Sequence, residues 1–476
     1  MTLTFDPEID PETLGGRRVT IVGLGKGRTT AGLARYLVER GARVTITDPK
    51  ARAELAEGIA RLGDTPAALV LAPASDDAAL ADPDVVFFIP GQRPRSTTVQ
   101  RAIARGIPVA TEIGLFFRLC PAPIVGITGT KGKSTTTTLV ARILGQGRRR
   151  IIVGGNIGNA VIQDLPTITS DDLVLLELSS FQLETLGRSP HIAVVTNVLE
   201  DHLDHHGTRE AYVAAKRNIV AWQTRDDIAV LNLDDPAVAL LHAGAVSTVR
   251  GSSLERRPEY GAWLDGDELA LVDGARSRRL CAASELRVPG RHNVANALAA
   301  AIVGDVYGIP DAAIAQELRA FGGLPHRLET IGQHDGVLWV NDSQGTTPYA
   351  TIPALAAYGR PPVVILGGVS KAADFTALGR AVVAQARGAI LIGQAADDIA
   401  AAIERAREPG RAEPVIVRTA SLREAVDAAR TIARSGDVVL LSPACASFDM
   451  FASYEDRGDQ FAALVREFAA PAPVAS

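Results

Sequence analysis

The sequence predicts an α/β protein of three domains, each built on a mainly parallel sheet. Short apolar runs that suit buried strands alternate along the chain with stretches whose apolar residues recur at helical spacing. Two of these strands run directly into glycine-rich turns, at residues 23–27 and 129–132, and a helical stretch follows each turn. Turn-rich breaks at residues 120–123 and 322–327 separate the three alternating regions.

The composition is that of a globular protein. The 476 residues, of which 47% are hydrophobic, suffice for several cores, and a net charge of −5 gives no basic footprint for nucleic acid. Three widely spaced cysteines indicate neither a disulfide framework nor a zinc knuckle. The first 20 residues lack the apolar core of a signal peptide, and no run of about 18 apolar residues follows. We therefore expect a cytoplasmic protein with neither a membrane nor a nucleic-acid partner.

The first domain, predicted over residues 1–119, begins like a Rossmann-type βαβ unit. An apolar strand runs into the turn Gly23-Leu-Gly25-Lys-Gly27, and the next strand ends on Asp48. The third glycine falls at 27 rather than 28, so the dinucleotide fingerprint is incomplete. The residues therefore leave two interpretations open, a nucleotide site or a βαβ unit with a tight turn. A later strand ends in Pro90-Gly91.

The second domain, predicted over residues 120–323, opens on a glycine loop between a strand and a helix. The strand covers residues 124–128, and the loop and helix start hold Gly129, Thr130, Lys131, Gly132, Lys133, Ser134 and Thr135. Loop N–H groups and a helix N-terminus attract phosphate, Lys133 would reach the outer phosphates, and the Ser134 or Thr135 hydroxyl would hold Mg²⁺. The strict motif needs glycine where the chain has Ile127, so a turn that binds nothing is the alternative.

Polar residues follow three later strands of this domain. Asn156, Glu177 and the Ser179 to Gln182 segment stand at strand ends, where ligands gather in parallel sheets. Glu177 follows a buried apolar run and is suited to hold Mg²⁺, directly or through water. A solvated strand end is the alternative interpretation.

A histidine-rich segment follows the strand at residues 192–198. The spacing of His202, Asp204, His205 and His206 would allow a zinc or two-metal hydrolase site on a helix. A solvated polar turn is the alternative for His205 and His206. We favour His202 alone as a ligand or substrate contact, because it lies nearest the strand end.

Two more polar residues lie in helical stretches. Lys216 reads by default as a solvated surface charge. Asn293 and Asn296 share a face of the helix after Gly290, and they either cap it or contact a base or phosphate.

The third domain, predicted over residues 324–476, is a small doubly wound α/β unit. Its strands are predicted at residues 337–341, 362–367, 389–392, 414–417 and 437–441. Polar groups again follow the strands, near Asp342, Lys371 and Ser447.

Together these motifs resemble the Mur ligase family, the ATP-dependent amide ligases of peptidoglycan precursor synthesis. The resemblance covers nearly the whole chain and rests on residues 126–135, 177–184, 323–327, 442–451 and 455–461. Within the family, these motifs are similar to the branch that adds D-glutamate to UDP-N-acetylmuramoyl-L-alanine. The resemblance implies a Rossmann-like N-terminal domain for UDP, a central P-loop ATPase-like domain and a Rossmann-like C-terminal domain for the amino acid.

The resemblance also implies roles for single residues, with Mg²⁺ as cofactor and a monomer as the expected state. Catalysis and metal binding would fall to Lys133, Ser134, Glu177, His202 and a carbamylated Lys216. Asn296, Arg327 and Asp342 would contact the adenine nucleotide, together with the glycine loop. The sugar nucleotide would meet Gly23, Gly25, Asp48, Gly91, Asn156, Ser179, Gln182 and His202. The incoming glutamate would meet Thr346, Lys371, Ser447 and Tyr454.

Other functions share parts of this pattern. The same ligation with L-glutamate and folate polyglutamylation both fit the loop and the general plan. A nicotinamide dehydrogenase would use the first glycine turn but leaves the second loop unexplained, and a non-catalytic nucleotide-binding module would release no phosphate. The chain also departs from the family pattern at Gln344, where a lysine is usual.

Overall fold

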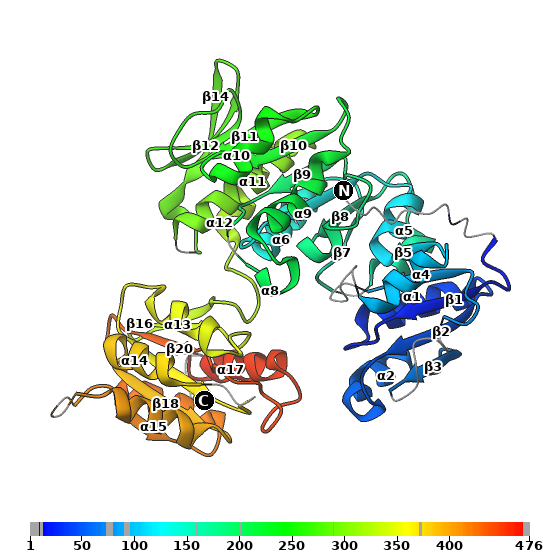
Figure 1. Ribbon diagram of the computed structural model, residues 1–476. Helices are drawn as coiled ribbons and strands as arrows, with labels where there is room; N and C mark the ends of the chain where they lie inside the picture. The colour runs from blue at the N-terminus through cyan, green and yellow to red at the C-terminus, as the bar shows by residue number, and fades with distance from the viewer. Residues whose placement is uncertain are drawn as a thin grey trace, which may run out of the picture. The chain divides into compact units, whose positions relative to one another are not determined.

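The computed structural model contains three sheets and divides into two compact units, Met1–Glu285 with Arg291–Arg319, and Leu286–Gly290 with Ala320–Ser476 (Figure 1). It describes the chain outside residues 1–8, 10–12, 73–79, 90–95, 159, 200, 289, 371–373, 409, 411 and 470–476. Within this described part, no helix combines the length and apolar character needed to cross a membrane.

The N-terminal sheet of the first unit has five parallel strands in the order β3-β2-β1-β4-β5. The strands are β1 (Arg18–Val22), β2 (Arg43–Asp48), β3 (Ala67–Leu71), β4 (Val85–Phe88) and β5 (Val109–Thr111). The described helices are α1 (Arg28–Glu39), η2 (Arg52–Leu55), α2 (Ala56–Leu62), α4 (Thr97–Ala104) and α5 (Glu112–Leu119). The order reverses between β1 and β4, so this sheet has its switch point where the Gly23 turn leaves β1.

The central sheet of the same unit has nine strands in the order β14-β13-β12-β11-β10-β9-β6-β8-β7. Its parallel strands are β6 (Ile124–Thr128), β7 (Ile151–Gly155), β8 (Leu173–Glu177), β9 (Ile192–Val195), β10 (Ile228–Asn232) and β11 (Thr248–Ser253). All five residues of β6 are buried, because the strand lies in the middle of the sheet with β8 and β9 beside it. The loop that leaves β6 therefore starts from a rigid position.

An antiparallel extension of this sheet was not predicted. It consists of β12 (Tyr260–Asp265), β13 (Glu268–Asp273) and β14 (Arg276–Ala282). The outermost strand, β14, begins with four exposed residues, Arg-Ser-Arg-Arg, so it has no apolar run by which sequence periodicity could find it. The predicted mainly parallel sheet is confirmed: the strands from β7 to β12 pair in parallel, and only the β12–β13 and β13–β14 pairings are antiparallel.

Helices cover the central sheet and join its strands. The main ones are α6 (Lys133–Leu144), α9 (Arg209–Ala221), α10 (Pro236–Ala243), α11 (Arg291–Val306) and α12 (Asp311–Ala320), with short helices η3 (Val161–Gln163), η4 (Leu165–Thr167), α7 (Ser180–Leu183), α8 (Leu203–His206) and η5 (Ala283–Glu285). Helix α11 is buried along most of its length and packs against α6. This packing brings a segment distant in sequence to the glycine loop.

The second unit holds a six-stranded sheet in the order β15-β16-β20-β17-β18-β19. The strands are β15 (Glu329–His334), β16 (Val337–Asn341), β17 (Pro362–Gly367), β18 (Gly388–Ile392), β19 (Val415–Arg418) and β20 (Val438–Leu441), and the helices are α13 (Pro348–Ala356), α14 (Thr376–Gln385), α15 (Ala396–Ala406), α16 (Leu422–Ile432) and α17 (Tyr454–Ala469). Only β15 runs antiparallel, and this polar, half-buried edge strand was not predicted.

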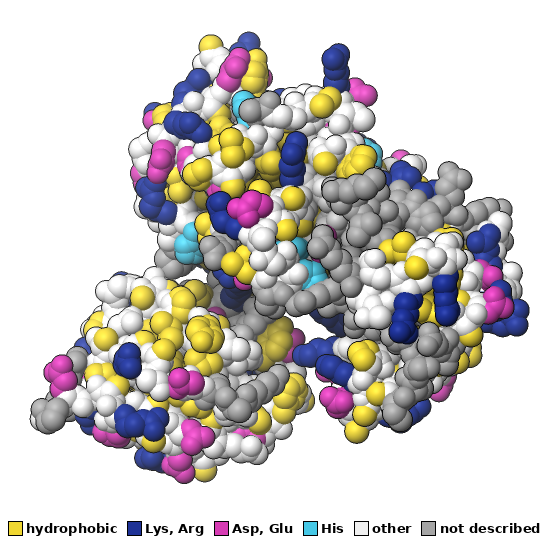
Figure 2. Space-filling view, viewed as in Figure 1, with side chains coloured by type: hydrophobic (Ala, Val, Ile, Leu, Met, Phe, Trp, Pro, Cys, Tyr) yellow, Lys and Arg dark blue, Asp and Glu magenta, His cyan; other side chains and the backbone are white. Residues whose placement is uncertain are grey.

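The predicted α/β class with three sheets is confirmed, and the predicted boundaries at residues 119 and 323 stay predictions. Positive and negative side chains are interspersed on the parts of both units visible in Figure 2. This mixture agrees with the modest net charge of −5.

Candidate functional site

The glycine loop after β6 opens helix α6 as the sequence predicts. Gly132 caps the helix with φ 84° and ψ −9°, a left-handed conformation that favours glycine. A Cβ at this position would overlap the side chain of Asn296, which is 5% exposed on α11. Glycine is therefore needed both for the turn and for the close approach of Asn296, and the fold brings this predicted nucleotide contact to the loop.

Two lysines converge on the loop. Lys133 Nζ donates to the carbonyl oxygens of Gly129 and Thr130, at 2.9 and 3.1 Å. Lys216 Nζ, from α9, donates to the same Gly129 oxygen at 2.9 Å and to Thr128 Oγ1 at 3.4 Å. Lys216 is only 2% exposed, so the interpretation of it as a surface charge is wrong.

The surroundings of Lys216 favour the neutral amine. Burial, and then the nearby charge of Lys133, lower the pKa of Lys216 to about 7, while Asp201 and Glu177 act in the opposite direction. The ring of Tyr212 lies beneath the amine, with the ring centroid 4.9 Å from Nζ. A lysine with this pKa is partly unprotonated near neutral pH and can act as a nucleophile.

Three predicted residues form a hydrogen-bonded set beside the loop. Ser134 Oγ, on the first turn of α6, donates to Glu177 Oε2 at 2.6 Å, and Asn156 Nδ2 donates to Glu177 Oε1 at 2.8 Å. Glu177 is 2% exposed at the end of β8, so the solvated strand end is excluded. A buried carboxylate and a hydroxyl this close offer the oxygen donors that Mg²⁺ prefers.

The other loop residues contact α9 and the segment that follows β9. Thr130 Oγ1 is hydrogen-bonded to the Tyr212 hydroxyl at 2.8 Å, and the Lys131 N–H donates to Asn197 Oδ1 at 2.9 Å. Lys131 Nζ also lies 3.6 Å from Asp201 Oδ2, whereas Thr135 is half-buried on α6. Sequence reasoning missed Tyr212, because an aromatic residue within a helical pattern carries no signal of a contact with the loop.

His202 precedes α8 in an unusual conformation. Its φ of 53° and ψ of 33° are left-handed, and its side chain is 46% exposed with Nδ1 3.9 Å from Asp201 Oδ1. The solvated-turn interpretation is wrong for the next two histidines, because the side chains of His205 and His206 are 9% and 1% exposed.

Ser179 and Gln182 form a capping box at the start of α7. Ser179 Oγ accepts from the Gln182 N–H, and Gln182 Oε1 accepts from the Ser179 N–H at 3.0 Å. Both side chains are buried, and their hydrogen bonds stabilise the turn that follows Glu177. Their predicted contact with substrate stays a prediction.

The N-terminal glycine turn is held by the acid at the end of β2. Asp48 Oδ2 accepts from the N–H groups of Leu24 and Gly25, at 2.8 and 3.2 Å, and Oδ1 accepts from the Lys50 N–H at 3.0 Å. Gly23 and Gly25 have φ values of 98° and 50°. The structure thus brings three of the four predicted sugar-nucleotide contacts of this domain together, whereas Gly91 lies outside the described residues.

In the second unit, Asp342 follows β16 and is buried. Its Oδ2 accepts from Ser442 Oγ at 2.6 Å, and its Oδ1 accepts from the Leu328 N–H at 3.2 Å. Burial raises the pKa of Asp342 to about 6, against the lowering effects of Ser442, the Leu328 N–H and the Arg327 charge. Arg327 itself is exposed.

Arg457 organises this end of the sheet and was not among the predicted site residues. Its fully buried guanidinium donates to Ser343 Oγ and to the carbonyl oxygens of Ser343 and Cys445, at 2.9, 2.9 and 3.2 Å. Burial lowers the pKa of Arg457 to about 10. An arginine in a polar helical stretch reads as solvated, so only its place in a recurring motif could have marked it.

Three of the four predicted glutamate contacts lie close in the chain to Arg457 itself or to Ser343 and Cys445, to which Arg457 donates hydrogen bonds. Ser447 is 2% exposed, Thr346 is half-buried, and Tyr454 starts α17, where its carbonyl oxygen accepts from Ser343 Oγ at 2.7 Å. Lys371 lies outside the described residues.

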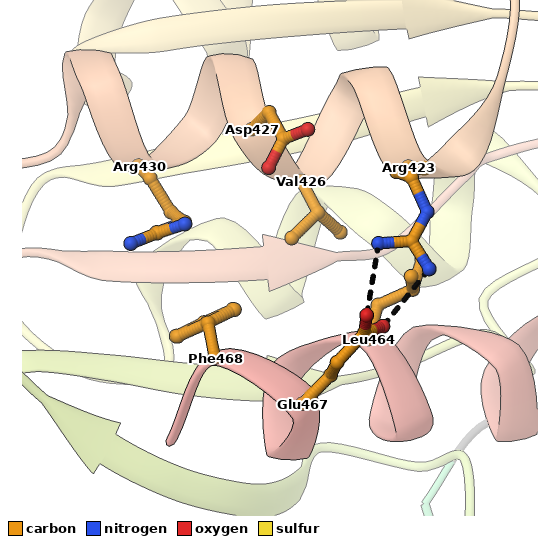
Figure 3. A pocket seen from close by; sticks show the side chains of 7 residues that line it. All are labelled: Arg423, Val426, Asp427, Arg430, Leu464, Glu467 and Phe468. Atoms are coloured by element: carbon orange, nitrogen blue, oxygen red, sulfur yellow. Dashed lines mark hydrogen bonds and ion pairs between the residues drawn. The ribbon is translucent and has the colours of Figure 1, made fainter. Parts of the chain in front are cut away.

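A separate groove of the second unit lies between α16 and α17 (Figure 3). Val426, Leu464 and Phe468 line it, and Arg423 forms an ion pair with Glu467 at its edge, with Nη2 2.9 Å from Oε2. It contains none of the predicted site residues.

The loop, the lysine at the first position of α6 and the Ser134–Glu177 pair define a nucleotide-binding α/β protein with a P-loop. Residues 17–111, 127–304 and 326–445 match the models of the MurD-like N-terminal domain, the Mur ligase middle domain and the Mur ligase glutamate ligase domain. The chain belongs to the Mur ligase family, an ATP-dependent ligase family, which confirms the resemblance.

Two relatives bear the name UDP-N-acetylmuramoylalanine--D-glutamate ligase. The protein of Pelotomaculum thermopropionicum is 40% identical over 451 residues, which is 94% of this chain and 97% of that protein. The protein of Symbiobacterium thermophilum is 41% identical over 452 residues, with the same coverage.

Solved structures show the same fold at lower identity. The UDP-N-acetylmuramate-alanine ligase of Thermotoga maritima superimposes with a TM-score of 0.55 and 19% identity, covering 95% of this chain and 100% of that chain. The MurF ligase of Thermotoga maritima, solved with ADP, gives 0.51 and 16%, covering 96% and 99%.

Proposed function

We propose that this chain joins D-glutamate to UDP-N-acetylmuramoyl-L-alanine at the expense of ATP, in peptidoglycan precursor synthesis. The observation that carries the proposal is the hydrogen-bonded set of Ser134, Glu177 and Asn156 at the mouth of the glycine loop. The printed names of the relatives at 40% and 41% identity support the choice of substrates. The MurD-like match of residues 17–111 favours this function over folate polyglutamylation, for which we expect a different first domain.

The glycine loop and the N-terminus of α6 would hold the phosphates of ATP. Backbone N–H groups and the helix dipole favour anions there, and Lys133 can move from the Gly129 and Thr130 carbonyls onto the transferred phosphate. Asn296 packs on Gly132 and would contact the nucleotide from α11. Arg327 and Asp342, which belong to the second unit, are the other residues that we assign to the adenine nucleotide.

The donors around Glu177 fit Mg²⁺. Ser134 Oγ and Glu177 Oε2 are oxygen atoms 2.6 Å apart, and Mg²⁺ takes oxygen ligands. His202 and a carbamylated Lys216 would be further ligands of the metal ion, either directly or through a water molecule. When bound, Mg²⁺ would neutralise negative charge on the transferred phosphate.

Lys216 would serve as a carbamate. Its neutral amine, favoured by burial, attacks the carbon of CO₂, forms an N–C bond and releases a proton, so that a neutral amine becomes an anionic carbamate. The nearby positive charge of Lys133, which lowers the pKa of the amine, would then stabilise the carbamate.

The remaining predicted residues would position the two other substrates. Asn156, Ser179, Gln182 and His202 would face the muramoyl-alanine end, while Gly23, Gly25, Asp48 and Gly91 would hold the uridine diphosphate. Thr346, Lys371, Ser447 and Tyr454 would form the glutamate pocket. We expect a cytoplasmic monomer.

The reaction would proceed through an acyl phosphate. A carboxylate oxygen of the substrate alanine attacks the γ-phosphorus of ATP, and ADP leaves. The glutamate nitrogen then attacks the activated carbonyl carbon, loses a proton and forms a tetrahedral intermediate. This intermediate collapses to the amide and inorganic phosphate, which keeps one alanine oxygen. Catalysis would consist of positioning and of charge neutralisation by Lys133 and the loop N–H groups.

The test is phosphate release by the purified chain with ATP, Mg²⁺ and UDP-N-acetylmuramoyl-L-alanine, with D- and L-glutamate offered separately. We expect release with D-glutamate that depends on the sugar nucleotide. Release with L-glutamate alone would overturn the stereochemical assignment. Absence of release with either, together with a thermal shift from a pterin and none from the UDP-sugar, would overturn the function.

A further inference from the structure

A second cluster of potential metal ligands lies outside the residues assigned to ATP and Mg²⁺. Glu184 directly follows α7, and His205 and His206 are the last two residues of α8. His205 Nε2 lies 3.1 Å from Glu184 Oε2, and His206 Nδ1 lies 3.9 Å from the same oxygen. One donor atom from each of the three residues lies within 4.8 Å of the others.

These separations suit a tetrahedral cation. Zinc–nitrogen and zinc–oxygen bonds of about 2.0–2.2 Å place neighbouring tetrahedral ligands about 3.4 Å apart. The two separations from Glu184 Oε2, 3.1 and 3.9 Å, lie on either side of this value. Small side-chain movements would therefore bring all three donors to bonding distance of one ion.

The surroundings of the histidines orient them for this task. His206 Nε2 lies 3.0 Å from Ser180 Oγ, and Ser180 is 2% exposed. When Nε2 carries the proton and donates it to Ser180, Nδ1 presents its lone pair toward Glu184, which is the usual arrangement of a metal-bound histidine with an outer hydrogen bond. The Phe181 ring packs on both imidazoles, with centroids 4.4 and 5.6 Å away.

We propose that Glu184, His205 and His206 form a binding site for a divalent cation of the Zn²⁺ class, with a fourth position open to water. Two imidazole nitrogens and one carboxylate are a set that zinc accepts, whereas Mg²⁺ prefers oxygen ligands. The site differs in chemistry and residues from the oxygen set of Ser134 and Glu177.

Occupancy would bear on the neighbouring residue His202. Both histidine ligands belong to α8, the four-residue helix that His202 precedes in a left-handed conformation. The Phe181 ring also lies 4.9 Å from the His202 ring, between centroids. A cation bound by Glu184 and by the two histidines of α8 would therefore restrict the movement of the backbone at His202.

The test is Zn²⁺ binding by the chelator-treated full chain, measured by isothermal titration calorimetry in the presence of excess Mg²⁺. We expect one Zn²⁺ per chain, with affinity at least about 10-fold lower in H205A and E184Q and about 10- to 100-fold lower in S180A. H242A removes an exposed histidine of α10 in the same unit and should bind as the wild type does.

A second measurement keeps the test independent of folding defects. Circular dichroism selects variants that retain the native fold, and H206A is avoided because this side chain is only 1% exposed. Co²⁺ in place of Zn²⁺ should give the intense visible absorption of tetrahedral coordination, and H205A should lose it. Equal Zn²⁺ affinity of H205A and the wild type, or a weak octahedral Co²⁺ spectrum in the wild type, would overturn the proposal.

Discussion

Two helices of the first unit each begin after a glycine in the same left-handed backbone conformation, and they differ in the side chains around that glycine. Gly27 precedes α1 with φ 81° and ψ −5°, and Gly132 precedes α6 with φ 84° and ψ −9°. Each glycine follows a buried parallel strand, β1 or β6. Backbone conformation alone therefore does not distinguish the two turns.

The side chains around the two turns make the difference. At the first turn, the carboxylate of Asp48 already accepts the N–H groups of Leu24 and Gly25. At the second, Lys133 occupies the first helical position, and Ser134 beside it reaches the acid Glu177. A glycine turn before a helix is thus a general device, and the lysine, the hydroxyl and the acid on the adjacent strand mark the proposed site of phosphoryl transfer.

The largest expected effect comes from removing the lysine that distinguishes the second turn. K133A should lower kcat/KM for ATP about 10²- to 10³-fold, because one charged donor to the transferred phosphate is lost. R28A is the matched control, since Arg28 holds the same place after Gly27 and its exposed side chain donates to the Gly158 carbonyl oxygen. Steady-state phosphate release measures both variants. Wild-type kinetics in K133A would contradict the conclusion that Lys133 distinguishes the second turn from the first in function.

The buried lysine beside the second turn gives the next effect. K216R should lower activity about 10- to 100-fold, because a guanidinium does not form the proposed carbamate. Protein equilibrated with ¹³C-labelled bicarbonate should show a carbamate signal by NMR, stronger well above the Lys216 pKa of about 7 than well below it. A signal unchanged in K216R would place the carbamate elsewhere, and its absence from the wild type would contradict the assignment.

Removing the charge of Asp48, the acid at the first turn, should affect the stability of the fold more than the binding of ATP. D48N should lower the free energy of unfolding by about 1–3 kcal/mol, because hydrogen bonds from Leu24 and Gly25 to a buried carboxylate become bonds to a neutral amide. Urea unfolding measures the change, and the KM for ATP should stay at its wild-type value. An unchanged unfolding curve with a raised KM for ATP would show that the two turns are not separate in function.

The last prediction concerns a buried acid that accepts fewer hydrogen bonds from backbone N–H groups than Asp48 does. Glu112 on α5 accepts the Ile162 N–H at 3.1 Å, and burial raises the pKa of Glu112 from 4.5 to about 7. Its protonated form therefore stabilises the fold below pH 4.5, and this contribution is lost as the pH rises through about 7. E112Q should flatten the dependence of the melting temperature on pH in this window. An equal slope in both proteins would exclude Glu112 as its source.

The sequence predicts the parts of the structure whose signals are local. The strand, glycine loop and start of α6 follow within about a dozen residues, so composition and spacing suffice to find them. The strands β14 and β15 were missed because they are polar edge strands, whose exposed residues break the apolar pattern. Edge strands are defined by their neighbours more than by their own residues.

Burial of charge is the second feature that periodicity does not reveal. Lys216 and Arg457 lie in helical stretches that read as solvated, yet they are 2% and 0% exposed. Their burial follows from contacts with segments far away in the chain, the Gly129 carbonyl for Lys216 and the Ser343 carbonyl for Arg457. For Lys216, only the resemblance to a known family indicated a role.

The most direct measurement of the central idea, phosphorylation of the alanine carboxylate, follows its oxygen. UDP-N-acetylmuramoyl-L-alanine labelled with ¹⁸O in that carboxylate is incubated with ATP, Mg²⁺, D-glutamate and the wild-type chain, and the released phosphate is analysed by mass spectrometry. An acyl phosphate predicts one ¹⁸O atom in each phosphate that accompanies amide formation. Amide formation with unlabelled phosphate would contradict the account.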